Sequence, residues 1–225
     1  METTMRHVYI INPAAGRDDA TAALIEQIER AYADIDDGLT VSSYITQACG
    51  DATRYVRQFC EQHPDEPVRF YACGGDGTLN EVVNGAVGYP QAAVGLIPSG
   101  TGNDFVRNFT PLEQFRNLNA QRVGREIEID LLRCNGDVSL NICSVGLDAR
   151  IGTDVANYKR LPLLSGFRAY AVSALVNTIR GVKEHYVVEI DGKVLDGRFT
   201  FVTACSGRFY GGGFNPVPEA DPTDG

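Results

Sequence analysis

The stretch VRFYACGGDGTLNEVVNG, residues 68–85, decides the fold of this chain. It runs from an apolar segment through three glycines around one aspartate into apolar residues spaced three and four apart. This pattern predicts a buried strand, a tight turn and a helix. Glycine loses more backbone freedom on folding than other residues, so Gly74, Gly75 and Gly77 indicate that something approaches the backbone closely.

Strand and helix patterns alternate over the first hundred residues. Strands are predicted at 7–11, 41–45, 68–73 and 92–98, with amphipathic helices between them. This order predicts a parallel sheet covered by helices, in which ligands bind beyond the carboxyl ends of the strands. Four polar segments, three of them rich in glycine, fall at that edge: NPAAGR (12–17), TQACGD (46–51), CGGDGT (73–78) and PSGTGND (98–104).

The second half of the chain has a different pattern of strand and turn signals. The segment REIEIDLL (125–132) alternates charged and apolar residues, and Asn135-Gly136 and Asp191-Gly192 are hairpin signals. HYVVEI (185–190) and RFTFVTAC (198–205) are further strand candidates, with one helix predicted near 165–178. We expect two domains, an α/β domain at 1–120 and an antiparallel domain at 121–225.

Composition narrows the class of protein. The 225 residues carry a net charge of −9, from 20 basic and 29 acidic residues, which argues against general nucleic-acid binding. Six cysteines without a C-x-x-C pair are expected to be reduced, buried thiols. The sequence has neither the pattern of a signal peptide nor an apolar run long enough to span a bilayer, so a cytoplasmic location is expected.

The glycine loops have the chemistry of an anion site. A strand, a glycine turn and a helix start leave free N–H groups, and the helix dipole favours negative charge there. Asp76 would repel a phosphate unless a divalent cation lies between them or the carboxylate handles a proton. A plain turn with Asp76 as helix cap is the alternative. No P-loop occurs, and Phe105 replaces the last glycine of a dinucleotide fingerprint.

Three motifs together resemble the diacylglycerol kinase catalytic-domain family, which includes bacterial lipid kinases and sphingosine kinases. They are NPAAG (12–16), GGDGTLNEVVNG (74–85) and IPSGTGNDFVR (97–107). GGDGT alone is less specific, because NAD kinases and phosphofructokinases have related loops. Weaker similarity continues in EIDLL, NICSVGLDA and SGRFYGGGFNPVPEADPTDG, so the resemblance covers essentially the whole chain.

The resemblance implies an ATP- and Mg²⁺-dependent lipid kinase. Its fold would be an α/β nucleotide-binding domain, similar to NAD kinase and phosphofructokinase, followed by an antiparallel β-sandwich. Asp76 would be the central catalytic carboxylate, with Asp104 and Asp130 in an acidic network around it. Asp224 (side chain) and Asp221 (backbone carbonyl) would hold a structural magnesium. The implied ATP contacts are Asn12, Pro13, Ala14, Ala15, Gly16, Thr46, Gly74, Gly75, Asp76, Gly77, Thr78, Leu79, Asn80 and Thr101.

The sequence departs from the family at its end. It stops at PTDG, inside the magnesium motif, whereas family members continue with further strands and a catalytic glutamate that acts as general base. The expectation is therefore a truncated β-sandwich, a third magnesium ligand and a base beyond Gly225, and a chain that is itself inactive.

A lipid substrate requires peripheral contact with a membrane. Four basic residues, with leucines and a phenylalanine between them, either form a local basic-apolar contact or belong to an ordinary solvated loop before a core helix. They are Arg150, Lys159, Arg160 and Arg168, with Leu161, Leu163, Leu164 and Phe167.

Two rival functions remain open at this point: a kinase for a soluble acceptor such as NAD, and a nucleotide- or lipid-binding module without catalysis. Formation of a homodimer is open as well.

Overall fold

The structure is a computed structural model that describes residues 5–16, 19–33, 39–100, 102–109, 112–158, 172–173, 175–177 and 181–225. The chain forms two compact units. Unit 1 consists of Met1–Asn141 together with Ser206–Gly225, and unit 2 consists of Ile142–Cys205. The last twenty residues therefore belong to the same unit as the glycine loops.

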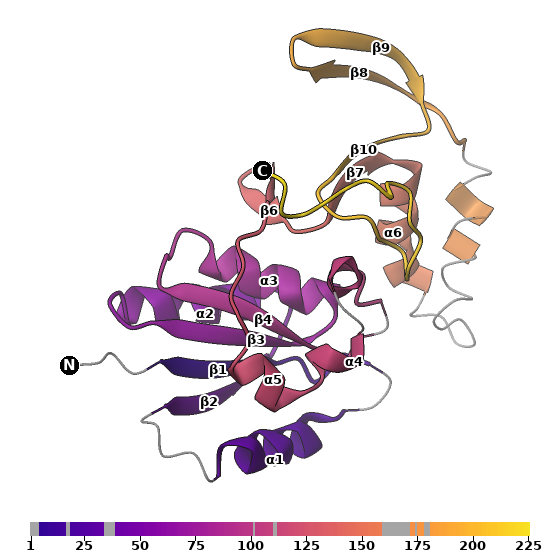
Figure 1. Cartoon of the computed structure of the whole chain (residues 1–225). Helices are drawn as coiled ribbons and strands as arrows, with labels where there is room; N and C mark the ends of the chain where they lie inside the picture. The colour runs from indigo at the N-terminus through magenta and orange to yellow at the C-terminus, as the bar shows by residue number, and fades with distance from the viewer. Residues whose placement is uncertain are drawn as a thin grey trace. The chain divides into compact units, whose positions relative to one another are not determined.

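Unit 1 is built on a parallel sheet of four strands in the order β2-β1-β3-β4 (Figure 1). Its strands are β1 (Arg6–Ile11), β2 (Thr40–Ile45), β3 (Val68–Gly74) and β4 (Ala92–Pro98). Cys73 of β3 lies opposite Ile11 of β1 and Ile97 of β4, so these strands end at the same edge. The predicted parallel sheet is confirmed.

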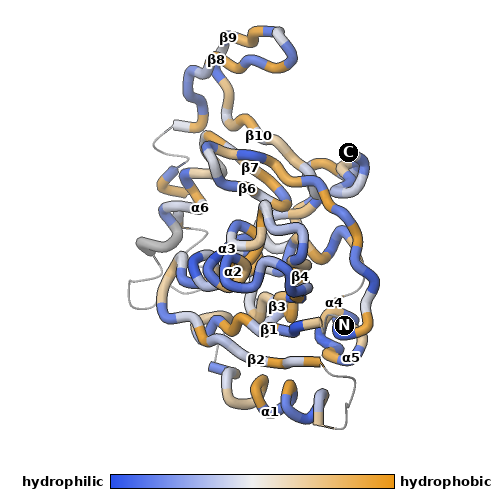
Figure 2. Tube along the Cα trace, turned by 90° about the vertical axis from the view of Figure 1, so that its left-hand side faces the viewer, coloured by the Kyte–Doolittle hydropathy of each residue, from blue (hydrophilic) through white to orange (hydrophobic). Residues whose placement is uncertain are grey.

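Helices cover both faces of this sheet (Figure 1). Side chains alternate along a strand, so Val8 and Ile10 belong to one apolar cluster and Tyr9 and Ile11 to another. The first cluster includes residues of α2 (Asp51–Gln62) and α3 (Asp76–Ala86), and the second residues of α1 (Thr21–Tyr32) and α5 (Leu118–Arg122). Hydrophobic and hydrophilic stretches alternate along α1, as expected of a helix with one face on a sheet (Figure 2).

Helices α2 and α3 pack closely at Gly85. A Cβ atom added there would lie 2.7 Å from the carbonyl oxygen of Thr53 and 2.7 Å from the Cβ of Val56. The absence of a side chain at this position lets α3 approach α2, and α3 carries the glycine loop at its amino end.

Short elements follow β4: the 3₁₀ helix η1 (Phe105–Asn108), α4 (Leu112–Phe115) and α5, and then the hairpin of β5 (Leu132–Cys134) and β6 (Asp137–Ser139). The hairpin predicted at Asn135-Gly136 is confirmed, because both residues have positive φ, 51° and 101°.

The alternation of charged and apolar residues in 125–132 is typical of a strand, but residues 125–131 have no regular secondary structure. A strand needs a neighbouring strand for its ladder of hydrogen bonds. The N–H of Asp130 instead donates to the carbonyl of Pro222 at 2.8 Å. Among the residues that the structure describes, β4 pairs with β3 alone, so segment 125–131 forms no hydrogen-bond ladder with β4.

Unit 2 contains antiparallel strands, as predicted. Strand β7 (Ile142–Gly146) pairs with β10 (Phe201–Cys205), and β8 (Glu184–Ile190) pairs with β9 (Lys193–Phe199). The β8–β9 turn has φ of 51° at Asp191 and 76° at Gly192. The strand candidate RFTFVTAC is divided between β9 and β10, which pair with different strands. Thr200 lies between them, and its carbonyl accepts from the N–H of Leu147 at 2.9 Å.

Helix α6 (Leu147–Tyr158) also belongs to unit 2. The helix predicted at 165–178 and residues 159–168 of the basic-apolar segment lie largely outside the described residues. Arg150 of that segment is described, and it forms an ion pair with Glu184 at 2.8 Å. Among the helices that the structure describes, none has the length and apolar character needed to cross a bilayer.

Candidate active site

Three loops from neighbouring strands meet at the carboxyl edge of the sheet in unit 1. Asn12, directly after β1, donates from Nδ2 to the hydroxyl of Thr78 at 2.9 Å, and its N–H donates to the carbonyl of Cys73 at 3.1 Å. After β4, the N–H of Ser99 donates to the carbonyl of Gly74 at 2.9 Å. The loop after β3 is thus bonded on one side to the loop after β1 and on the other to the loop after β4.

Glycine is needed where these loops touch. Gly16 has φ of 91°, and a Cβ there would lie 2.9 Å from the carbonyl oxygen of Ser99. A Cβ on Gly100 would lie 2.5 Å from the Cα of Gly75. Gly77 is different, because a Cβ there would meet no atom within 4 Å. Gly16, Gly75 and Gly100 therefore serve packing between loops, whereas Gly77 borders open space.

Helix α3 begins at Asp76 without a side-chain cap. The carboxylate of Asp76 accepts a hydrogen bond at Oδ1 from the N–H of Phe105, at 3.0 Å and 29 residues further along the chain. Interpreting Asp76 as a helix cap is therefore wrong, since its carboxylate serves another segment. The first N–H groups of α3 have no carbonyl partner within the helix, which is the condition for binding an anion.

A second carboxylate, that of Asp104, lies beside Asp76. Both face Gly102, where an added Cβ would lie 2.9 Å from Oδ2 of Asp76 and 3.6 Å from Oδ2 of Asp104. Asp104 is only 6% exposed; its Oδ2 accepts from the N–H of Gly212 at 2.8 Å, and its Oδ1 lies 3.3 Å from Nε of Arg107. Two carboxylates that converge on a bare glycine form a donor set suited to a hard divalent cation.

Of the other residues predicted to contact ATP, some lie at this edge of the sheet and one has its side chain in the apolar core. Ala14 and Ala15 donate their N–H groups to Asn12, and the hydroxyl of Thr46 donates to the carbonyl of Ile11 at the end of β1, so these residues lie at the same edge. The side chain of Leu79 belongs to the apolar core and is 3% exposed.

Three further predicted residues complete the set. Pro13 lies within the turn after β1, and the carbonyl of Asn80 accepts from Asn84 inside α3. Thr101 lies outside the described residues.

The other three acidic residues predicted for the site are Asp130, which contacts the end of the chain, and Asp221 and Asp224, which belong to it. Oδ2 of Asp130 accepts from the N–H of Gly225 at 2.9 Å, and Asp221 accepts from the hydroxyl and N–H of Thr223. The hydrogen bond from the Thr223 hydroxyl lowers the pKa of Asp221. Asp224 is exposed. No group of three metal-ligating side chains is found within the described part of the chain, so the structural magnesium site stays a prediction.

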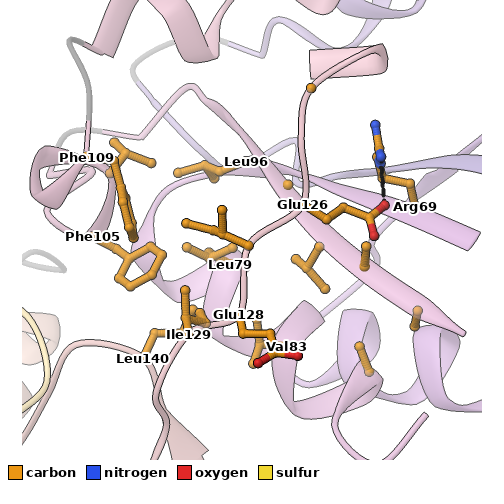
Figure 3. A pocket seen from close by; sticks show the side chains of 18 of the residues that line it. Arg69, Leu79, Val83, Leu96, Phe105, Phe109, Glu126, Glu128, Ile129 and Leu140 are labelled. Carbon is orange, nitrogen blue, oxygen red and sulfur yellow. Dashed lines mark hydrogen bonds and ion pairs between the residues drawn. The ribbon is translucent and has the colours of Figure 1, made fainter. Parts of the chain in front are cut away.

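An apolar pocket of about 870 Å³ lies in unit 1, between β4, α3 and the irregular segment 125–131 (Figure 3). Leu79, Leu96, Phe105 and Ile129 are among the residues that line it (Figure 3). The Phe105 that lines this pocket is also the residue whose N–H holds Asp76, so the pocket and the loops share one residue.

Sequence reasoning missed three residues of this site: Gly102, Arg107 and Gly212. Gly102 and Arg107 lie within the motif IPSGTGNDFVR, so their position in the motif was a usable signal. Gly212 lies 108 residues after Asp104, and only the triple glycine of residues 211–213 indicated a special backbone there.

The fold and the loops define a class of α/β protein in which glycine loops and two convergent carboxylates lie beside a helix amino terminus, at the carboxyl edge of a parallel sheet. Residues 6–134 match the diacylglycerol kinase catalytic domain, and residues 141–225 match the YegS C-terminal NAD kinase beta sandwich-like domain. The chain belongs to the diacylglycerol kinase catalytic-domain family. The predicted family and the predicted fold class are therefore confirmed.

Similar proteins come from Staphylococcus aureus. A protein of strain JH9 that bears the provisional name of lipid kinase is 25% identical over 188 residues, which are 82% of this chain and 61% of that protein. A protein of strain MRSA252 with the same kind of name is 24% identical over 188 residues, with the same shares covered. The chain thus spans about three-fifths of the length of these relatives.

Solved structures from Bacillus anthracis strain Sterne share the fold. A diacylglycerol kinase structure matches with a TM-score of 0.67 and 24% identity, over 98% of this chain and 70% of that one. A second structure, provisionally titled a diacylglycerol kinase, matches with a TM-score of 0.71 and 23% identity, over 100% of this chain and 74% of that one.

Proposed function

We propose that this protein transfers the γ-phosphate of ATP to the hydroxyl group of a lipid such as a diacylglycerol. The observation that carries the proposal is the pair of carboxylates, Asp76 and Asp104, facing Gly102 where glycine loops meet at the edge of the sheet. Membership of the diacylglycerol kinase catalytic-domain family supports the lipid as acceptor.

The glycine loops would bind the phosphates of ATP. The uncapped first turn of α3 offers N–H groups, and the open space at Gly77 lets a phosphate oxygen approach the backbone. The loop after β1, at residues 12–16, would add further N–H groups. Asp76 and Asp104 would hold Mg²⁺, which neutralises charge on the phosphates when it is bound.

The reaction is an exchange of one phosphorus–oxygen bond for another. The lipid hydroxyl oxygen forms a bond to the γ-phosphorus, the bond from that phosphorus to the β–γ bridging oxygen breaks, and ADP leaves. The hydroxyl proton passes to a base. The protein must position the groups and stabilise charge, and these are the tasks for which its rigid loops and carboxylates are suited.

Mixed micelles of diacylglycerol, incubated with labelled ATP, Mg²⁺ and the purified protein in its full natural length, test the proposal. We expect label in the lipid fraction, and we expect Asp76→Asn to abolish most of it. Asp65→Asn is the matched control, because Asp65 is an exposed turn residue outside the site. Transfer to NAD and to no lipid would favour the soluble-acceptor kinase. ATP binding without any transfer would favour the binding module.

A further inference from the structure

A glycine-rich segment from the end of the chain covers Asp104. Residues 206–213, here called the returning segment, place the N–H of Gly212 at 2.8 Å from Oδ2 of Asp104. Gly211, Gly212 and Gly213 have φ of 66°, 90° and 105°, a conformation that only glycine adopts without strain. Three such glycines have high conformational freedom by themselves, so other contacts must hold the segment on the carboxylate.

The side chain of Asn108, in η1, supplies one set of these contacts. Its Oδ1 accepts from the N–H of Arg208 at 2.9 Å. Its Nδ2 donates to the carbonyl of Phe105 at 2.7 Å and to Oδ1 of Asn141 at 3.4 Å. One amide group therefore ties the returning segment to the residue whose N–H holds Asp76.

Asn141 supplies the other set. Its main-chain carbonyl accepts from the N–H groups of Ser206 at 2.9 Å and Gly207 at 3.0 Å, and its side-chain Nδ2 donates to the carbonyl of Phe209. Together with the bond from Arg208 to Asn108, four consecutive residues of the returning segment are each bonded through the backbone to one of two asparagines.

The fit at Gly207 is an independent sign of this arrangement. A Cβ atom added there would overlap Oδ1 of Asn141 and would lie 2.7 Å from Nδ2 of Asn108. The backbone of the segment thus passes in direct contact with both amide groups. Even a methyl group at this position would push the asparagines away.

We propose that Asn108 and Asn141 are positioning residues, which hold the returning segment on Asp104 and so keep that carboxylate directed at the site. The inference rests on the proposed function for its kinetic consequence. Neutral amides suit this task, because they bind the backbone without adding charge beside a site for ATP and Mg²⁺.

Amide hydrogen exchange of the protein without substrate tests the contact directly. Asn108→Ala should accelerate exchange at residues 206–213 by about tenfold or more, because one lost hydrogen bond corresponds to roughly a factor of ten. Gly207→Ala should act in the same way through overlap, and it provides a second route if Asn108→Ala folds poorly. Unchanged exchange in both variants would overturn the inference.

Asn84→Ala is the matched control. Asn84 also binds backbone from both ends of its amide, since its Nδ2 donates to Val138 O at 2.9 Å and its Oδ1 accepts from Val138 N at 2.9 Å. Asn84→Ala should lower the free energy of unfolding by about as much as Asn108→Ala does. It should leave the amide exchange rates of residues 206–213 within about twofold of wild type. Equal acceleration in Asn84→Ala would mean that general loosening is responsible, and would overturn a specific role for Asn108.

Kinetics separate a positioning role from a merely structural one. Asn108→Ala should lower kcat for lipid phosphorylation about tenfold and leave KM for ATP within about twofold, because the loop at Gly74–Thr78 keeps its own hydrogen bonds to Asn12 and Ser99. Faster exchange with unchanged kcat would overturn the positioning role. If the wild-type protein phosphorylates no lipid, the proposed function fails, and the exchange comparison alone decides whether the asparagines hold the segment.

Discussion

Replacing Gly77 by alanine is expected to strengthen the fold and to weaken ATP binding at the same time. Gly77 is the second residue of α3, and an added Cβ would meet no atom within 4 Å. Alanine is favoured over glycine in a helix by roughly 0.5–1 kcal/mol. For a chain of this length that corresponds to a rise in Tm of about 1–4 °C.

The effect on ATP follows from the same open space. If a phosphate oxygen takes an N–H of this turn, the methyl group prevents its close approach and removes a charge-assisted hydrogen bond worth about 1.5–3 kcal/mol. The dissociation constant of Mg²⁺-ATP should therefore rise by about 10- to 100-fold. Thermal unfolding and titration calorimetry of the same sample measure both quantities.

Gly85→Ala is the matched control, because it places the same methyl group on the same helix where space is lacking. Contact with the Thr53 carbonyl and with Val56 should cost about 1–3 kcal/mol of unfolding free energy, while the folded protein keeps its ATP affinity. A Gly77→Ala protein with a raised Tm and unchanged ATP affinity would refute the phosphate site at α3. A lowered Tm would refute the assignment of Gly77 as a glycine that the fold does not need.

Three further outcomes are expected. Asp76→Asn keeps an acceptor oxygen for its backbone bond, so we expect a wild-type Tm but a kcat for lipid phosphorylation lowered by about 10²–10³; a kcat near wild type would contradict the proposed role. The hydrogen bond from the N–H of Gln47 lowers the pKa of the buried Asp51 carboxyl in the folded protein. The ionised carboxylate therefore stabilises the fold at pH values above the ordinary carboxyl pKa of about 4, and this stabilisation is lost as the pH falls. The Tm difference between wild type and Asp51→Asn should therefore shrink as the pH falls below 4, and a constant difference would exclude this linkage. Burial raises the pKa of the Cys60 thiol to about 11, so iodoacetamide at pH 8 should label exposed Cys49 in the native protein and spare Cys60, as mass spectrometry of the peptides would show.

The parallel sheet was predictable because local sequence determines it. Residues 68–73 and 92–98 are apolar runs, each flanked by glycine or proline and separated by a helical pattern, and such signals need no knowledge of distant residues. The hairpins at Asn135-Gly136 and Asp191-Gly192 were predictable for the same reason, since the dipeptide itself prefers the positive φ of the turn.

The failures arise where a distant segment decides the outcome. The alternation in 125–131 is typical of a strand, but β4 provides no ladder and the end of the chain takes the Asp130 N–H instead. Asp76 has the spacing of a helix cap, but Phe105 supplies its hydrogen bond. No pattern in the sequence predicts the hydrogen bond between Asp104 and Gly212, because the two residues lie 108 positions apart.

The contact between Phe105 and Phe109 has a spectroscopic consequence. Their rings lie edge to face, with centroids 5.3 Å apart and planes at 69°, and the N–H of Phe105 is bonded to Asp76. The chain contains ten tyrosines and no tryptophan. A tryptophan introduced at position 109 would thus be the single indole of the molecule, and its emission could be excited at 295 nm with little contribution from tyrosine. Its fluorescence would follow movements of the loop that holds Asp76, in real time and without a label.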